Sequence, residues 1–216
     1  MPYRLTPFIN ESYYHIFNRG INKQNIFHSP SDYFHFIKIF EYYQFGNPKP
    51  SFSQYNRFKI IDFTKNPKII DINCYCLMTN HFHFLLKQNK EGGVQEFIRK
   101  ALNSYTKYYN TKNNHSGPIL QGEFKAVLIE TDEQLLHLSR YIHLNPYVNG
   151  ISKTIKAYPY SSYLEYTGTP EKRICSTKPI LEHFNSSEEY KEFISGHGDY
   201  ARELVQMQHL LIDPEE

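Results

Sequence analysis

Residues 77–86 read LMTNHFHFLL, and this stretch decides the fold. It joins an apolar segment, residues 69–78, to a second β-like segment, residues 81–87, through the turn-forming pair Thr79-Asn80. Strands joined by so short a turn run antiparallel. The sequence therefore predicts two paired antiparallel strands in the middle of the chain.

The segments on either side of this pair predict an α+β domain. Residues 12–18 and residues 124–129 are rich in aromatic and β-branched residues, which favours strands. Apolar residues at helical spacing predict helices over residues 32–45, 94–110 and 131–144. We expect Pro146 to stop the last of these helices. This order of elements is close to a ferredoxin-like antiparallel sheet with helices on one face.

The composition excludes several classes of protein. The chain has 216 residues, 35 of them Tyr or Phe and none Trp, so Phe and Tyr must supply much of the core. No apolar run approaches the 18 residues of a membrane span, and the N-terminus lacks the apolar core of a signal peptide. Three cysteines do not make a disulfide framework. We expect a cytoplasmic protein without a membrane partner.

The small net charge of +2 hides a difference between the two ends of the chain. Residues 1–160 carry a net charge of +8, whereas residues 161–216 carry −6. We interpret this as a basic body with an acidic C-terminal appendage, in which residues 187–194 and 200–211 are expected to be helical. Chance segregation of charge is the alternative.

His81 and His83 alternate with Phe82 and Phe84 in the second strand. Successive side chains of a strand point to opposite faces, so the two imidazoles share one face and the two phenyl rings share the other. Imidazoles on residues about 7 Å apart at their Cα atoms can converge on one divalent ion. Two half-exposed histidines without a ligand would show the same spacing.

Cys74 and Cys76 lie just before the two histidines and permit another interpretation, a four-ligand zinc site with His81 and His83. Zinc-binding cysteines usually have at least two residues between them, and cysteines that simply pack as small apolar side chains are more common. A small zinc-binding protein stays an alternative.

A polar row follows the predicted helix over residues 131–144. His137, Tyr141 and Asn145 recur every four residues, so they line one face of the helix beside an apolar stripe. A tyrosine hydroxyl presented there to the sheet could be a nucleophile, and Asn145 could offer a neutral oxygen ligand. Ordinary, partly buried polar residues fit the same pattern.

Basic and aromatic residues are interleaved around these motifs. Cations can meet phosphates and rings can stack on unpaired bases, so this combination is typical of a groove for single-stranded nucleic acid. The basic residues are Arg19, Lys23, Lys87, Lys90, Arg99, Lys100, Lys107, Lys112 and Lys125. The neighbouring rings include Tyr105, Tyr108 and Tyr109. Solvent-exposed basic helix faces over an aromatic core would give the same sequence pattern.

Four motifs occur in a fixed order along the chain: YHIFNRG at 14–20, LMTNHFHFLL at 77–86, YIHLNP at 141–146 and YSSY at 160–163. In this order they resemble the single-tyrosine HUH transposases, and among these the REP-associated tyrosine transposases. The resemblance covers residues 12–168, and residues 169–216 match no pattern of the family. We therefore expect a transposase domain over residues 1–168 and a mostly helical acidic extension over residues 169–216.

The resemblance implies a bacterial enzyme that cuts and rejoins single-stranded DNA beside a hairpin. Tyr141 corresponds to the nucleophile, which would form a 5′-phosphotyrosine. His81 and His83 correspond to the metal-binding histidines, and Asn145 to a further ligand, with Mg²⁺ or Mn²⁺ as the cofactor. Relatives include dimers, so a homodimer is possible. His143, beside the nucleophile, is expected to be structural rather than a proton carrier.

We expect the DNA contacts to come from the basic body of the chain, and list as candidates Arg19, Lys23, Lys87, Arg99, Lys107 and Lys125. Residues 46–68 predict an irregular connection with five basic residues and one acid, which could contact a hairpin. Two alternatives stay open. The nucleophile could lie instead among Tyr105, Tyr108 and Tyr109, or the chain could be a domesticated nucleic-acid-binding protein that does not use a nucleophile.

Overall fold

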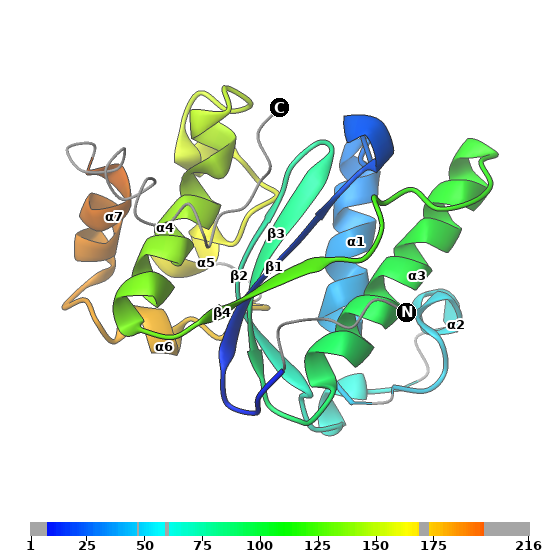
Figure 1. Ribbon diagram of the computed structural model, residues 1–216, viewed down its shortest axis with the longest axis horizontal. Coiled ribbons are helices and arrows are strands. Elements are labelled where there is room, and N and C mark those ends of the chain that lie inside the picture. The colour runs from blue at the N-terminus through cyan, green and yellow to red at the C-terminus, as the bar shows by residue number, and fades with distance from the viewer. Residues whose placement is uncertain (1–7, 47, 59–60, 169–172, 197–216) are drawn as a thin grey trace.

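A four-stranded antiparallel sheet lies between two layers of helices in the computed structural model, which describes residues 8–46, 48–58, 61–168 and 173–196 (Figure 1). The strands are β1 (Tyr13–Arg19), β2 (Ile70–Leu77), β3 (His81–Gln88) and β4 (Lys125–Ile129). Their order in the sheet is β2-β3-β1-β4, with every neighbouring pair antiparallel. The predicted ferredoxin-like sheet is confirmed, and β2 and β3 are the pair expected around residues 77–86.

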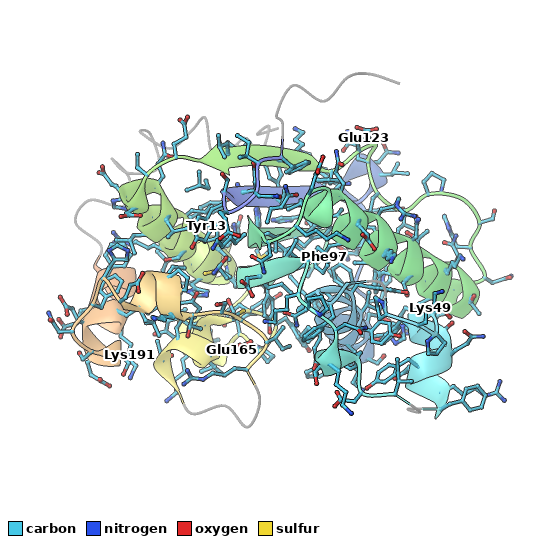
Figure 2. All side chains as sticks on the ribbon, turned by 90° about the horizontal axis from the view of Figure 1, so that it is seen from below. Tyr13, Lys49, Phe97, Glu123, Glu165 and Lys191 are labelled. Carbon is cyan, nitrogen blue, oxygen red and sulfur yellow. The ribbon has the colours of Figure 1, made fainter. Side chains whose placement is uncertain are left out.

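Helices cover both faces of the sheet, so the expectation of helices on one face is wrong. One face carries α1 (Pro30–Tyr43) and α3 (Gly93–Asn113), with the short α2 (Phe52–Phe58) beside them (Figure 1). The other face carries α4 (Asp132–Val148), α5 (Tyr163–Thr167), α6 (Lys178–Leu181) and α7 (Ser187–Ser195). After β4 the described residues form no further strand, and α4 returns across the face that α1 and α3 leave open. Lys49, just before α2, and Lys191 of α7 lie at opposite ends of the molecule (Figure 2).

Strand β3 divides its side chains between two hydrophobic cores, as its alternation predicts. Phe82 and Phe84 belong to the core beneath α1 and α3. Leu85 belongs to the core beneath α4, and His83, two residues earlier in the same strand, contacts the ring of Tyr141 from α4. The predicted separation of imidazoles and phenyl rings is confirmed.

Two of the predicted boundaries are wrong. Pro146 lies inside α4, which continues to Val148 instead of ending before the proline. Its position in the last turn limits the loss to one backbone hydrogen bond, and Asn149 N–H still closes the helix on the Asn145 carbonyl at 3.1 Å. Residues 46–68 are not wholly irregular, because α2 forms there with the buried ring of Phe52 as its anchor.

Three single-turn 3₁₀ helices complete the described elements: Ile21–Lys23, Phe63–Lys65 and Ile155–Ala157. Helix α7 confirms the helix expected near residues 187–194, whereas the one expected over residues 200–211 lies outside the described residues. In the described part of the chain, none of the helices has the length and apolar character that a membrane crossing requires.

Asp32 ties the start of α1 to α3. Its carboxylate accepts the backbone N–H groups of His28 and Ser29 at 2.9 Å each and the Tyr108 hydroxyl at 2.9 Å, and it forms an ion pair with Lys112. Burial alone would raise the pKa of Asp32, but the hydrogen bonds from Lys112, His28, Tyr108 and Ser29 outweigh it and lower the pKa to about 2. The carboxylate is therefore charged, and it caps the helix.

We expect Asp32→Asn to lower the free energy of unfolding at pH 7 by about 1–2 kcal/mol, because a charged cap and its ion pair are lost. The folded pKa of about 2 lies below the unfolded value of about 3.9. The stabilisation is therefore complete above about pH 4 and is lost as the pH falls towards the folded pKa of about 2. Urea unfolding of both proteins from pH 7 downward should show the difference narrowing in that window. Asp62→Asn, at an exposed cap, is the control, and an equal effect there would contradict the prediction.

Candidate active site

The predicted nucleophile and the histidine pair meet on the sheet face that α4 covers. The ring of Tyr141 stands edge-on to His83, with ring centroids 5.3 Å apart, and to His15 of β1, at 6.2 Å. The rings of His81 and His83 are perpendicular, with centroids 5.0 Å apart. Helix α4 presents Tyr141 this way because Leu138 and Ile142, on either side of it, pack into the core beneath α4, which we call the second core. We call His15, His81, His83 and Tyr141 the candidate site.

His83 is fully buried. Its ring forms a hydrogen bond with His15, in which Nδ1 of His83 lies 2.9 Å from Nε2 of His15. Its Nε2 is buried without a hydrogen-bond partner among the described residues. Burial, with smaller contributions from His81 and His15, holds the pKa of His83 well below its usual range. His83 is thus a neutral imidazole whose Nε2 has no partner, which costs free energy unless a ligand meets it.

His81 lies at the start of β3 and is held from the turn before it. Its Nδ1 lies 2.6 Å from Oδ1 of Asn80. The Asn80 side-chain Nδ2 donates in turn to the Lys23 carbonyl at 3.1 Å. The nitrogen that His81 can offer to a ligand is therefore Nε2.

The histidine pair fits a divalent metal ion. A histidine that binds a metal must be neutral there, and it usually makes a hydrogen bond through its second nitrogen. His81 and His83 both make such a hydrogen bond through Nδ1. No group of three or more His, Cys, Asp or Glu side chains in the described ranges could hold a metal by itself. Asn145 is buried, and its Oδ1 accepts a hydrogen bond from Asn149 at 3.1 Å. The two histidines would thus need further oxygen ligands, of which a DNA phosphate is one.

The predicted four-ligand zinc site is wrong. Both thiols pack in the second core: Cys74 Sγ donates to the Tyr166 hydroxyl at 3.3 Å, and Cys76 Sγ lies 3.6 Å from Met78 Sδ. Burial raises the pKa of Cys74 to about 12 and that of Cys76 well above its usual range. In the described ranges, these thiols and the two histidines do not form a group that could hold a metal ion.

The alternative tyrosines on α3 lie on the opposite side of the sheet from His83 and have structural partners. The Tyr105 hydroxyl donates to the Ile26 carbonyl at 2.6 Å, and Tyr109 contacts His28 Nε2 at 3.0 Å. Burial raises the pKa of Tyr105 above its usual range. Of the tyrosines considered as nucleophiles, the structure brings Tyr141 to the histidine pair.

The two other histidines of α4 have contacts typical of structural residues. His143 is fully buried between the Tyr190 hydroxyl and Ser162 Oγ, both at 2.8 Å, and burial lowers its pKa to about 3. His137 is half-buried, with Nε2 4.0 Å from a Glu133 carboxylate oxygen and its ring against that of Phe193.

Two of the predicted DNA contacts lie beside the histidines. Arg19 pairs with His81 across β1 and β3, and Lys125 pairs with Phe17, which itself pairs with His83. Lys125 Nζ lies 5.8 Å from the centre of the Phe17 ring.

Of the other four candidates, Lys23 reaches the site through its backbone carbonyl, which accepts from Asn80, the partner of His81. Lys23 is exposed in the loop after β1, and Arg99 and Lys107 are exposed on α3. Lys87 forms an ion pair with Glu11.

His15 is the residue that sequence reasoning missed. It is fully buried on β1, and its position within YHIFNRG made it part of a recognised motif without assigning it a role. The signal that could have found it is the alternation of β1, which places His15 on the same face of the sheet as Phe17 and the histidine pair.

Among solved structures, one similar to this chain is that of a REP-associated tyrosine transposase bound to a REP hairpin. The two share 14% sequence identity and superpose with a TM-score of 0.55, covering 81% of this chain and 90% of that chain. No family model and no curated protein matches the sequence.

This chain has an HUH-type α+β fold. Specifically, it is the fold of a REP-associated tyrosine transposase, the family that the four sequence motifs resemble.

All three cysteines are free and buried, Cys175 included. Burial raises the pKa of Cys74 to about 12 and those of Cys76 and Cys175 well above their usual range. We therefore expect all three to react with a thiol reagent about 10³-fold more slowly in the native protein than after unfolding. The measurement is labelling followed by mass spectrometry, together with zinc analysis of the purified protein. Rapid native labelling, or one tightly held zinc per chain, would contradict this account.

Proposed function

We propose that this chain is a metal-dependent transposase that cleaves and rejoins single-stranded DNA beside a hairpin, with Tyr141 as the nucleophile. The observation that carries the proposal is the packing of the Tyr141 ring against His83 and His15, on the same sheet face as His81. The similar solved structure, a transposase bound to a hairpin, supports the choice of substrate.

His81 and His83 would hold the metal ion through their Nε2 atoms, with Asn145 as a proposed further ligand. When bound, Mg²⁺ or Mn²⁺ supplies charge neutralisation of the scissile phosphate. Imidazole ligands favour Mn²⁺ over Mg²⁺, which prefers oxygen. The protein contributes the neutral state of His83, which its burial maintains.

The chemistry of Tyr141 conserves the energy of the broken bond. Its phenolic oxygen bonds to the phosphorus, its proton leaves, and the bond from phosphorus to the 3′-oxygen breaks. That oxygen takes up a proton to become a free 3′-hydroxyl, and the phosphate stays on Tyr141 as a 5′-phosphotyrosine. In the reverse direction a 3′-hydroxyl attacks the phosphotyrosine and releases the phenol, so rejoining needs no further energy source.

The DNA path is proposed from the charges around the site. Arg19 and Lys125 flank the histidine pair across the sheet, where they can meet the phosphates on either side of the cleavage point. We assign Lys23, Lys87, Arg99 and Lys107 to more distant contacts. Segment 46–68, with exposed Lys49, Arg57 and Lys65, is the proposed hairpin contact.

A second candidate function follows from the burial of the nucleophile. The side chain of Tyr141 is 9% exposed, which would suit a DNA-binding protein that keeps the fold without the reaction. The two functions differ in whether a covalent bond to DNA forms.

We expect the wild-type protein to form a covalent adduct with a single-stranded oligonucleotide that carries a hairpin and its flanking sequence, in the presence of Mn²⁺ or Mg²⁺. Tyr141→Phe should abolish the adduct, because it removes the attacking oxygen and leaves the ring in place. Denaturing gel electrophoresis and mass spectrometry of the attached peptide measure both. Tyr109→Phe, the same change on α3, is the matched control and should leave the adduct unchanged. An adduct that persists in Tyr141→Phe moves the nucleophile elsewhere, and a wild type without any adduct favours the binding protein.

Two sets of variants separate the proposed DNA contacts. Lys125→Gln should reduce by about 0.7 the slope of log affinity against log salt for unpaired flanking DNA, the effect of one lost phosphate contact. The triple change Lys49→Gln, Arg57→Gln and Lys65→Gln should instead reduce the salt slope for binding of the isolated hairpin. Lys191→Gln removes a cation of α7, which is paired with Glu188, and controls for net charge. Equal slopes for all variants would refute the proposed path.

A further inference from the structure

We propose that Asn80 and His15 are positioning residues that set the tautomers of His81 and His83, so that both histidines present Nε2 to the divalent ion. The inference rests on the proposed function, in which these two histidines hold the metal. It adds to that function a pair of residues that touch neither DNA nor metal and act through the ligands. Each ligand histidine has its own partner, and both partners engage Nδ1.

The hydrogen bond between Nε2 of His15 and Nδ1 of His83 holds a single proton, which belongs to one ring or the other. If His15 donated to His83 Nδ1, the proton of His83 would sit on Nε2, a buried N–H without a partner among the described residues. That proton would also block metal binding. If His83 donates through Nδ1, its Nε2 keeps a lone pair, which a metal ion can satisfy. The second arrangement is the one compatible with a ligand.

Packing fixes the orientation of this pair. The rings of His15 and His83 stack with centroids 5.2 Å apart and planes at 19°, and Phe17 stacks on both, at 4.7 Å from His15 and 5.9 Å from His83. Both histidines are fully buried, so rotation of either ring would disturb the core around it. Because Tyr141 also contacts both rings, the same residues position ligand and nucleophile together.

The orientation of the Asn80 amide is set by the loop that follows β1. The Lys23 carbonyl can only accept, so it takes the Asn80 Nδ2 donor and turns Oδ1 towards His81. An oxygen acceptor at 2.6 Å requires the proton of His81 on Nδ1, which leaves Nε2 for the ion.

This loop has a backbone shaped for the contact. Asn22 and Lys23 have positive φ angles of 53° and 58°, conformations that such residues rarely adopt. Gly20 donates its N–H to the Asn80 carbonyl at 2.7 Å, and a Cβ on Gly20 would lie 2.1 Å from the Gln24 carbonyl oxygen. The loop therefore holds Asn80 by two of its groups, the backbone carbonyl and the side-chain amide.

The direct test is the tautomer of each histidine in the metal-free full-length protein, measured by long-range ¹H–¹⁵N correlation of the imidazole nitrogens. We expect His81 and His83 both protonated on Nδ1. Asn80→Ala and His15→Phe should each shift the affected histidine towards the other tautomer. A wild-type spectrum with the proton on Nε2 of either histidine would overturn the inference. This measurement needs neither DNA nor metal, so it stands if the proposed reaction fails.

The second test is Mn²⁺ affinity without DNA, from the electron paramagnetic resonance signal of the free ion. We expect Asn80→Ala and His15→Phe to bind Mn²⁺ about 10–100-fold more weakly. His15→Gln, which keeps an amide oxygen as acceptor, should recover part of the loss. The matched control is Asn110→Ala, which removes the same kind of contact, at 2.9 Å, from His115 at the far end of α3. Wild-type affinity in Asn80→Ala and His15→Phe would overturn the inference. If circular dichroism shows that His15→Phe does not fold, the Mn²⁺ affinities of Asn80→Ala and His15→Gln decide the question.

Discussion

The hydrogen bond between His15 and His83 is the interaction on which the candidate site depends. Strands β1 and β3 are central in the sheet and are covered on both faces, so neither imidazole can meet bulk water. A buried polar ring must find a partner within the protein, and these two find each other at 2.9 Å. Tyr141 packs across this pair, so the place of the proposed nucleophile is defined relative to two histidines that cannot easily move.

The sheet could be predicted from the sequence because its signals are local. A two-residue turn fixes the direction of β3 against β2, and strict alternation separates Phe82 from His83. The crossing of α4 to the second face is not a local property. It depends on the second apolar face that Cys74, Cys76 and Leu85 offer to the helix. Leu85 and Leu86 are adjacent in β3 and therefore point to opposite faces, which was the available sign that both faces would be covered.

The candidate site was predictable to the extent that its residues belong to ordered motifs. His81, His83 and Tyr141 could be selected that way, and the structure brings them together. His15 also belongs to one of these motifs, but the motif gave it no role, and only the alternation of β1 places it on the face of the histidine pair. The cysteine pair shows the opposite error. Cys74 and Cys76 have a suggestive spacing, but both thiols pack in the core beneath α4 and belong to no metal-binding group of the described residues.

Elements near the acidic end of the chain pack against helix α4, which carries Tyr141, the proposed nucleophile. Ile180 of α6 and Tyr190 and Ile194 of α7 lie in the same core as Tyr141. The Tyr190 hydroxyl lies 2.8 Å from Nδ1 of His143, which is two residues beyond Tyr141 and therefore points to nearly the opposite side of α4. Helix α4 is therefore held on one side by the sheet and on the other by elements that lie beyond the family motifs. Because a helix between two packed surfaces can neither slide nor rotate without breaking one of them, the described part of this extension shares the task of aiming Tyr141 at the histidine pair.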